Sequence, residues 1–179
     1  MHILILGNSF TGKSNLAKSL AQKFAERGED IIVYDPLKSR GWPAKAEKFA
    51  SAKKFFEHVR TAQNAHVFCD EAATLWGEDN KQADRLLYNR RHQGLLVYLI
   101  AQRASMIRPN GRNQCSTVMA FRQQLDDAQT LAAEYHPDMM QVIGLEDTYF
   151  YMARGTAIYP MQLDFSHGEP PRPVPATEK

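Results

Sequence analysis

The stretch "GNSFTGKS", residues 7–14, follows the apolar run "HILIL" and leads into a helical pattern. It fits the motif G-x-x-x-x-G-K-[ST] at Gly7, Gly12, Lys13 and Ser14. Glycines permit backbone angles that other residues avoid, so successive N–H groups of such a loop can face phosphate oxygens. The stretch therefore predicts a phosphate-binding loop between a strand and a helix.

The motif assigns a task to each part of this loop. Lys13 is expected to reach the β and γ phosphates of a bound nucleotide, and the Ser14 hydroxyl is expected to bind Mg²⁺. The helix that begins near Gly12 adds its positive end. The predicted nucleotide site consists of Gly7, Asn8, Ser9, Phe10, Thr11, Gly12, Lys13, Ser14 and Asn15. The alternative is a solvated Gly-Lys turn, which the flanking strand and helix disfavour.

The composition is that of an ordinary globular chain. The 179 residues suffice for one compact domain, and a net charge of +2 neither favours nor excludes nucleic acid. Two cysteines, Cys69 and Cys115, have no metal-type spacing and indicate a reduced, cytosolic protein. We expect no signal peptide and no membrane span, because no apolar run approaches about 18 residues.

Short apolar strands alternate with helical patterns along the chain. The alternation predicts an α/β fold with three layers, in which helices cover both faces of a mostly parallel sheet. A C-terminal hairpin is predicted to turn at Arg154-Gly155. We expect a domain over 1–165 and an extended proline-rich tail over 166–179. The strands are predicted at 2–6, 30–35, 65–72, 95–102 and 116–122, the helices at 12–28, 46–62, 79–93 and 126–135, and the hairpin at 147–160.

Two adjacent carboxylates, Asp70 and Glu71, end the apolar strand in "HVFCDEAATLW". At the carboxyl end of a parallel strand both can face the phosphates. Asp70 is expected to serve the Mg²⁺ shell, and Glu71 is expected to accept a proton from the attacking water. The alternative is a helix N-cap, which explains one carboxylate but not the buried strand that leads to both.

A further polar residue, Gln102, follows the apolar strand "LLVYLIA". If this fourth strand lies between the first and the third, Gln102 stands between Ser14 and Asp70, where a glutamine can orient water and report hydrolysis. By spacing alone, a glutamine that faces solvent at the strand end explains the pattern equally well.

Four motifs together resemble the FtsK–HerA superfamily of ring-shaped DNA-pumping ATPases. "LIAQRASMIRPNGRNQCSTVMAFR" resembles that family's strand end with Gln-Arg, short helix and strand ending in Phe-Arg. "VYDPLK" and "RRHQGLLVYLIAQ" are similar to the segments after its second strand and before its fourth, and the phosphate loop is the fourth match. The resemblance covers about residues 1–135. Within the superfamily, the chain looks most like the genome-packaging ATPases of tailless, membrane-containing bacterial viruses.

The resemblance implies a parallel sheet of core order 5-1-4-3-2 and the RecA-like type of P-loop fold. It also implies the same roles for Lys13, Ser14, Asp70, Glu71 and Gln102, and an arginine given to the neighbouring subunit's γ phosphate. The candidates for that arginine are Arg91, Arg103, Arg112 and Arg122. We favour Arg112, which is expected on a loop beyond the active edge of the sheet. Ala101 and Ala104 depart from the family's Thr and Pro.

The resemblance implies a subunit that hydrolyses ATP and translocates DNA, expected to be double-stranded, through the pore of a homo-oligomeric ring of five or six copies. Its implied surroundings are the host cytoplasm or the virion, with a capsid vertex protein as docking partner. Candidate pore loops are "PLKSRGWPAK", with Lys38, Arg40 and Lys45, and "WGEDNK". A solvated surface turn is an equally good explanation of Lys38 and Arg40, and Trp42 and Trp76 are expected to be packing residues.

Two other functions remain open from the sequence. A phage assembly or secretion ATPase of the zonula-occludens-toxin type belongs to the same superfamily, but such chains typically carry a membrane span. A P-loop small-molecule kinase has a similar length, but it needs an acceptor pocket and no adjacent Asp-Glu with a downstream Gln.

Overall fold

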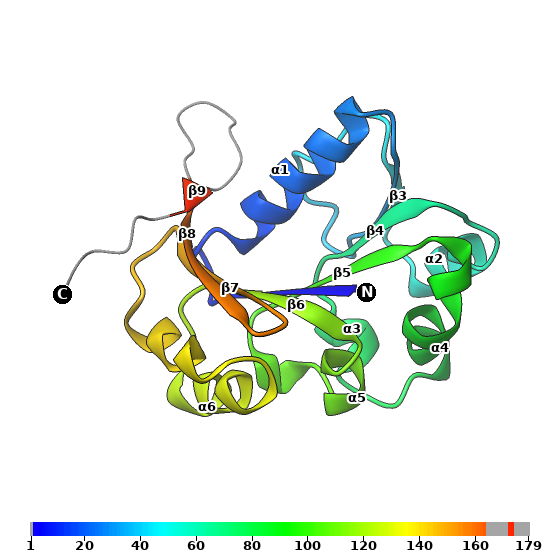
Figure 1. The fold of residues 1–179 in the computed structure, drawn as a ribbon. Helices are drawn as coiled ribbons and strands as arrows, with labels where there is room; N and C mark the ends of the chain where they lie inside the picture. The colour runs from blue at the N-terminus through cyan, green and yellow to red at the C-terminus, as the bar shows by residue number, and fades with distance from the viewer. Residues whose placement is uncertain (1, 164–171, 174–179) are drawn as a thin grey trace.

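The structure is a computed structural model that describes residues 2–163 and 172–173, with side chains except at 89–91 and 172–173. These residues form one nine-stranded sheet in the order β3-β2-β4-β5-β1-β6-β7-β8-β9 (Figure 1). The strands are β1 (His2–Leu6), β2 (Asp30–Tyr34), β3 (Glu47–Phe49), β4 (Ala65–Cys69), β5 (Leu96–Ala101), β6 (Cys115–Ala120), β7 (Tyr149–Arg154), β8 (Ala157–Gln162) and β9 (Arg172–Pro173).

The central strands are parallel and run β2-β4-β5-β1-β6. This is the predicted core order 5-1-4-3-2 read from the other edge, so that expectation is confirmed. Strand β1 lies between β5 and β6, with Ile5 opposite both Ile100 and Met119. Because the strands are parallel, the segments that follow β1, β4 and β5 meet at one edge of the sheet.

Helices cover both faces, as predicted. On one face α1 buries its small and apolar side against the sheet, with Leu16, Ala17 and Ala21 in one core cluster. The other helices pack on the opposite face, where Phe55, Trp76, Leu86 and Leu131 share the second cluster (Figure 1). The α-helices are α1 (Lys13–Glu26), α2 (Ala52–Val59), α3 (Ala73–Trp76), α4 (Lys81–Asn89), α5 (Pro109–Arg112) and α6 (Leu125–Glu134), and the 3-10 helices are η1 (Arg90–Gln93), η2 (Ala104–Met106) and η3 (Pro137–Gly144).

The helix predicted over 46–62 is wrong in its first part. Residues Glu47–Phe49 form the edge strand β3, paired in parallel with β2, and α2 begins only at Ala52. The edge of β2 offers backbone groups that need partners, and this long-range pairing overrides the local helical pattern. The helix predicted over 79–93 likewise ends as α4 at Asn89 and continues as the 3-10 turn η1.

The predicted hairpin is confirmed, and its turn lies one residue later than expected. Arg154 pairs with Ala157, so Gly155 and Thr156 form the loop. Strand β7 pairs antiparallel with β6 and extends the parallel core. The predicted domain boundary at 165 and most of the predicted tail lie outside the described residues. The described pair Arg172–Pro173 forms β9 against β8.

The described residues contain no helix that combines the length and apolar character needed to cross a bilayer. Both cysteines are free and buried. Burial raises the pKa of the Cys115 thiol to about 12 and the pKa of Cys69 well above its ordinary value. These thiols are therefore core residues.

Candidate nucleotide-binding site

The loop between β1 and α1 requires glycine at both ends. A Cβ at Gly7 would lie 2.4 Å from Thr11 Oγ1 and 2.9 Å from Phe121 Cβ, so no side chain fits there. Gly12 has φ +108°, and a Cβ on it would lie 2.9 Å from Leu163 Cδ1. The two glycines of the motif are thus fixed by close packing and backbone conformation.

Hydrogen bonds hold this loop between the two neighbours of β1. The Gly7 N–H donates to the Ala101 carbonyl at 3.3 Å, and the Asn8 N–H donates to the Arg122 carbonyl at 3.4 Å. Within the loop, the Thr11 hydroxyl donates to the Asn8 carbonyl at 2.9 Å. The ends of β5 and β6 therefore hold the loop in shape before any ligand binds.

A cavity of about 400 Å³ opens on this loop, within the range of small-molecule sites. The cavity brings together three separate segments, which are the loop, the end of β4 and the end of β5. Lys13, at the start of α1, is largely buried beside it. The lining residues are Ser9, Phe10, Gly12, Lys13, Ser14, Asn15, Glu71 and Gln102.

The two carboxylates that follow β4 lie in different surroundings. Asp70 is buried, and its Oδ1 accepts a hydrogen bond from the Glu71 N–H at 3.1 Å. Burial raises the pKa of Asp70, and the negative charges of Asp35 and Glu71 raise it further. Glu71 is partly exposed and lines the cavity. Its φ of +52° is left-handed, an uncommon and strained conformation for this residue type.

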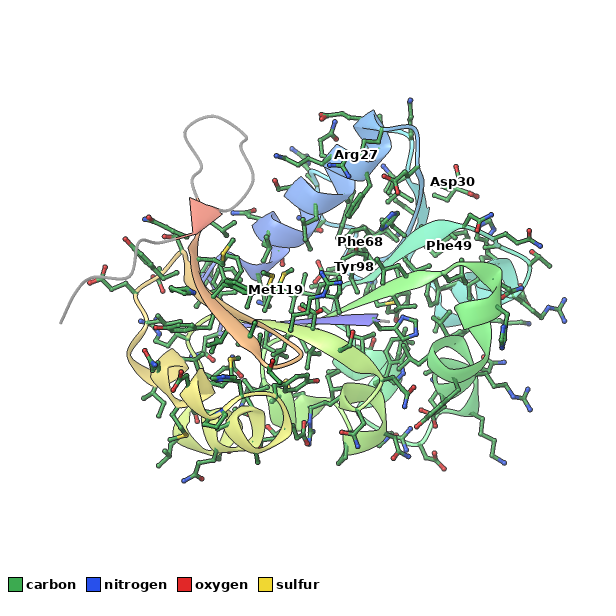
Figure 2. The ribbon with its side chains drawn as sticks, viewed as in Figure 1. Arg27, Asp30, Phe49, Phe68, Tyr98 and Met119 are labelled. Atoms are coloured by element: carbon green, nitrogen blue, oxygen red, sulfur yellow. The ribbon has the colours of Figure 1, made fainter. Side chains whose placement is uncertain are left out.

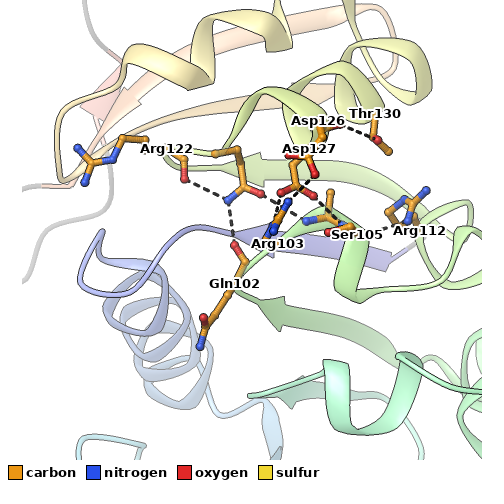
Figure 3. A network of polar contacts seen from close by, with 10 residues as sticks. Gln102, Arg103, Ser105, Arg112, Arg122, Asp126, Asp127 and Thr130 are labelled. Atoms are coloured by element: carbon orange, nitrogen blue, oxygen red, sulfur yellow. Dashed lines mark hydrogen bonds and ion pairs between the residues drawn. The ribbon is translucent and has the colours of Figure 1, made fainter.

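Gln102 lies where the strand order requires it. Because β5 lies between β1 and β4, the residue after β5 stands between the phosphate loop and the carboxylate pair. Its side chain lines the cavity, and in Figure 3 it points away from the polar network around its own backbone. The Gln102 carbonyl accepts a hydrogen bond from Gln123 Nε2 at 2.9 Å.

Sequence reasoning missed Gln123 and Asp127. The buried Gln123 side chain donates from Nε2 to the carbonyls of Gln102 and Arg122 and accepts from the Ala104 N–H. Asp127, fully buried at the start of α6, accepts from the Ser105 N–H at 2.8 Å and from Arg103 Nε at 2.6 Å (Figure 3). An available signal was the pair of acidic residues, Asp126 and Asp127, at the start of that helix.

Arg112 is not where the sequence placed it. It ends α5 just before β6, whose first residue Cys115 pairs with His2, so it lies at the amino edge of the sheet, opposite the loop. The guanidinium is buried, with Nε and Nη2 donating to Glu134 at 2.8 and 2.6 Å. Nη1 donates to the carbonyls of Ala104 and Ile107. The expectation of a loop beyond the active edge is therefore wrong.

The other arginine candidates differ in how firmly they are held. Arg103 forms ion pairs with Asp126 and the buried Asp127. Arg122 lies two residues beyond the end of β6, and its partly exposed side chain pairs at 3.2 Å with the exposed Asp147. The Arg91 side chain lies outside the described part of the chain.

The loop after β2 is organised by one carboxylate, Asp35. Its two oxygens accept from the N–H groups of Leu37 and Ser39, the Ser39 hydroxyl and Trp42 Nε1, at 2.7–3.0 Å. Burial raises the pKa of Asp35, but these hydrogen bonds outweigh it and lower the pKa overall. Trp42 and Trp76 are both buried, as expected of packing residues.

The donor set around the cavity suits Mg²⁺. The predicted ligands, the Ser14 hydroxyl and the Asp70 carboxylate, are hard oxygen ligands. Mg²⁺ is usually held by one or two such groups together with substrate phosphates and water. Among the described residues, no group of three or more His, Cys, Asp or Glu side chains is gathered as a protein-only metal cage. The buried Asp70 carboxylate, with its raised pKa, would gain from a nearby cation.

Comparison with solved structures finds several with this fold. The chain is similar to the DNA-packaging ATPase B204 from Sulfolobus turreted icosahedral virus, with a TM-score of 0.76 and 17% identity, over 89% of this chain and 95% of that one. It is similar to the genome-packaging NTPase B204 of Sulfolobus turreted icosahedral virus 2 in complex with ATP-gammaS, with a TM-score of 0.75 and 19% identity over 88% and 95%.

A third similar structure is the N-terminal domain of zonular occludens toxin from Neisseria meningitidis, with a TM-score of 0.61 and 16% identity over 93% and 94% of the two chains. No protein-family model and no curated protein sequence matches the chain. At these identities the likeness establishes the fold. The chain therefore has the P-loop ATPase fold of the viral genome-packaging proteins, in agreement with the resemblance of its motifs to the FtsK–HerA superfamily.

Proposed function

We propose that this protein hydrolyses ATP and that the hydrolysis drives DNA translocation, as a subunit of a viral genome-packaging motor. The observation that carries the proposal is the cavity in which the phosphate loop, Glu71 and Gln102 meet. The carboxyl ends of the strands β1, β4 and β5 bring these three segments to one place, and a P-loop ATPase needs phosphate binding, a base and a γ-phosphate contact at one place.

The proposed nucleotide site is the loop from Gly7 to Asn15. Its backbone N–H groups hold the phosphates, and the positive end of the 14-residue α1 adds to their stabilisation. Lys13 contacts the β and γ phosphates, and its low exposure beside the cavity supports this role. The hydrogen bonds that tie the loop to β5 and β6 mean that little ordering is needed when ATP binds.

Ser14 and Asp70 would hold Mg²⁺, which when bound neutralises charge on the β and γ phosphates. Glu71 is the proposed general base: it takes a proton from the attacking water. Its partial exposure and its position in the cavity suit that role. Gln102 is proposed to orient the water and to sense the γ phosphate.

A neighbouring subunit would complete this site with an arginine. To reach the neighbouring site, such a guanidinium has to leave its ion-pair partner within its own subunit at a small cost in free energy and extend outward. Arg112 is buried and bound on every side, and Arg103 is bound to a buried carboxylate. We therefore propose Arg122, whose pair with Asp147 is exposed, and retain Arg91 as the second candidate.

DNA contact is proposed for the loop after β2. Lys38 and Arg40 are exposed and take part in no ion pair among the described residues, while the four hydrogen bonds to Asp35 hold the loop rigid beneath them. A ring of five or six copies would line its pore with about a dozen such charges, each able to neutralise a phosphate. The proposed partners are double-stranded DNA, further copies of this chain and a capsid vertex protein, in the host cytoplasm or virion.

The deciding experiment is ATPase turnover with and without double-stranded DNA over a range of protein concentrations. The proposal expects specific activity to rise with concentration and to be stimulated by DNA. Specific activity that changes with neither the protein concentration nor the addition of DNA would contradict the ring and the DNA coupling. Phosphate transfer to a small-molecule acceptor would identify a kinase, and DNA-independent turnover that requires a membrane would favour the toxin-like alternative.

A further inference from the structure

Phe10, at the tip of the phosphate loop, is the most exposed large apolar side chain in the described residues. It is 98% exposed, and its ring stacks on no other aromatic ring in the described part of the chain. An isolated phenylalanine in water gives up the free energy that burial would supply. Nothing within the described subunit compensates for this exposure.

The backbone at Phe10 adds a second cost. Its φ is +68°, a left-handed conformation that is a genuine outlier for a bulky side chain. The loop could adopt this conformation more easily with glycine or asparagine. Two unfavourable features at one residue, beside a binding cavity, point to a role that appears when a ligand is bound.

The chemistry of the cavity identifies the part of the ligand that is concerned. Phe10 is the one residue with an apolar side chain among those that line it; its companions are glycine, hydroxyl, amide and charged residues. Those groups suit phosphates and water but provide no surface for a flat heteroaromatic base. Base–aromatic stacking requires a ring such as that of Phe10.

We propose that Phe10 contacts the nucleoside of the bound nucleotide and forms the stacking surface for its base. The inference rests on the proposed nucleotide site and extends it from the phosphates to the base. Glu71 and Gln102 mark the γ-phosphate side of the cavity, so Phe10 would serve the nucleoside that projects outward from the loop. Stacking uses the face that all bases share, and therefore binds adenine and guanine alike.

The test compares ATP, GTP and inorganic tripolyphosphate as ligands of wild-type protein, Phe10→Ala and Phe10→Tyr in calorimetric titrations with Mg²⁺. Alanine keeps the Cβ and removes the ring, whereas tyrosine keeps a ring. We expect Phe10→Ala to weaken ATP and GTP binding by about 5- to 150-fold, the effect of losing one base–aromatic stack, and to leave tripolyphosphate binding unchanged. Phe10→Tyr should bind all three ligands nearly as the wild type does.

Unchanged ATP affinity in Phe10→Ala would overturn the inference, and so would equal weakening of ATP and tripolyphosphate. An altered oligomeric state of the ligand-free variant, with unchanged ATP affinity, would assign Phe10 to a subunit contact instead. Lys13→Ala separates this inference from the function on which it rests. If the wild type binds no nucleotide, or if Lys13→Ala binds ATP normally, the proposed site itself fails.

Discussion

Gln123 Nε2 donates to the backbone carbonyl of Gln102 at 2.9 Å and thereby ties the end of β5 to the segment after β6. The same nitrogen donates to the Arg122 carbonyl, which also accepts the Asn8 N–H of the phosphate loop. One buried carboxamide thus fixes both the proposed γ-phosphate sensor and a wall of the phosphate loop. Because Gln123 would act only through these other groups, we propose it as a positioning residue.

Replacing Gln123 with Glu keeps its acceptor for the Ala104 N–H but removes the donor to the two carbonyls. We expect kcat to fall by about tenfold or more, since misplacement of a reacting group by about 1 Å can cost 10²-fold. The ATP Kd should change by less, because the loop keeps its other anchors. Gln124→Glu, at the exposed neighbouring position, is the matched control. A fall in kcat that merely follows a loss of folded protein, measured by thermal unfolding, would contradict a positioning role.

Glu71→Gln should retain ATP binding and lose turnover, because the amide keeps the shape of the side chain but cannot accept the proton. A general base contributes about 10²–10⁴-fold, so a loss of this size is expected in kcat. Single-turnover hydrolysis and nucleotide titration separate the two effects. Glu78→Gln, at an exposed position outside the cavity, controls for the charge change. Near-normal hydrolysis by the Glu71 variant would place the base elsewhere.

Asp70 and Asp35 should respond to pH with opposite signs in the nucleotide-free protein. The folded-state pKa of Asp70 is raised, so ionised Asp70 destabilises the fold at neutral pH and ceases to do so below its unfolded pKa of about 3.8. Asp70→Asn should therefore raise the Tm at pH 7, with the gain vanishing as the pH falls through the raised folded pKa to the unfolded pKa.

The folded-state pKa of Asp35 is lowered, so its contribution to stability is present above the unfolded pKa and is lost as the pH falls through the folded value. Asp35→Asn should lower the Tm at pH 7, and the loss should shrink on acidification. Thermal unfolding of both variants and the wild type between pH 3 and 8 checks the pair. A lower Tm for Asp70→Asn at pH 7 would show that its carboxylate stabilises the nucleotide-free fold.

Arg112 and Arg122 should behave as different kinds of arginine. Arg112→Ala removes one partner of a buried ion pair, worth about 3 kcal/mol or more. At about 2–4 °C per kcal/mol for a chain of this size, its Tm should fall by roughly 6–12 °C. Arg122→Ala removes only an exposed pair and should leave the Tm nearly unchanged while it lowers turnover by about 10³–10⁵-fold.

Mixing Arg122→Ala with Glu71→Gln subunits tests action between neighbours. Each variant alone should be nearly inactive, and the mixture should recover part of the activity wherever an intact site faces an intact arginine. No recovery would reject Arg122 as the donated arginine. The same mixture made with an Arg91 variant then distinguishes a wrong mechanism from a wrong residue.

Lys38→Ala with Arg40→Ala should weaken binding to double-stranded DNA regardless of sequence. Each phosphate contact that is lost should reduce the slope of log K against log salt by about 0.9. Lys53→Ala with Lys54→Ala removes the same charge from the exposed side of α2 and should leave the slope unchanged. Equal slopes for the two double variants would indicate that the loop is a solvated turn that does not contact DNA.

The sequence by itself determined the features that depend on neighbours along the chain. Glycine spacing and the strand before it predict a phosphate loop, because the backbone angles and the close approach to a ligand that such a loop needs are local requirements. The alternation of strands and helices specifies a mostly parallel sheet, since a crossover must return the chain to the same edge. Asp70, Glu71 and Gln102 could be proposed because each follows a buried strand of that sheet.

Only the tertiary structure decided which partners meet across long sequence separations. Glu134 lies 22 residues from Arg112 in the sequence, and their ion pair holds Arg112 inside the subunit. Arg112 is therefore not available for contact with a neighbouring subunit. Gln123 meets the carbonyls of Gln102 and Arg122 because β5 and β6 flank β1, and Glu47–Phe49 became a strand because the edge of β2 was available. A residue's free energy of pairing and burial depends on groups that the fold brings to it. The spacing of residues along the sequence does not reveal which groups these are.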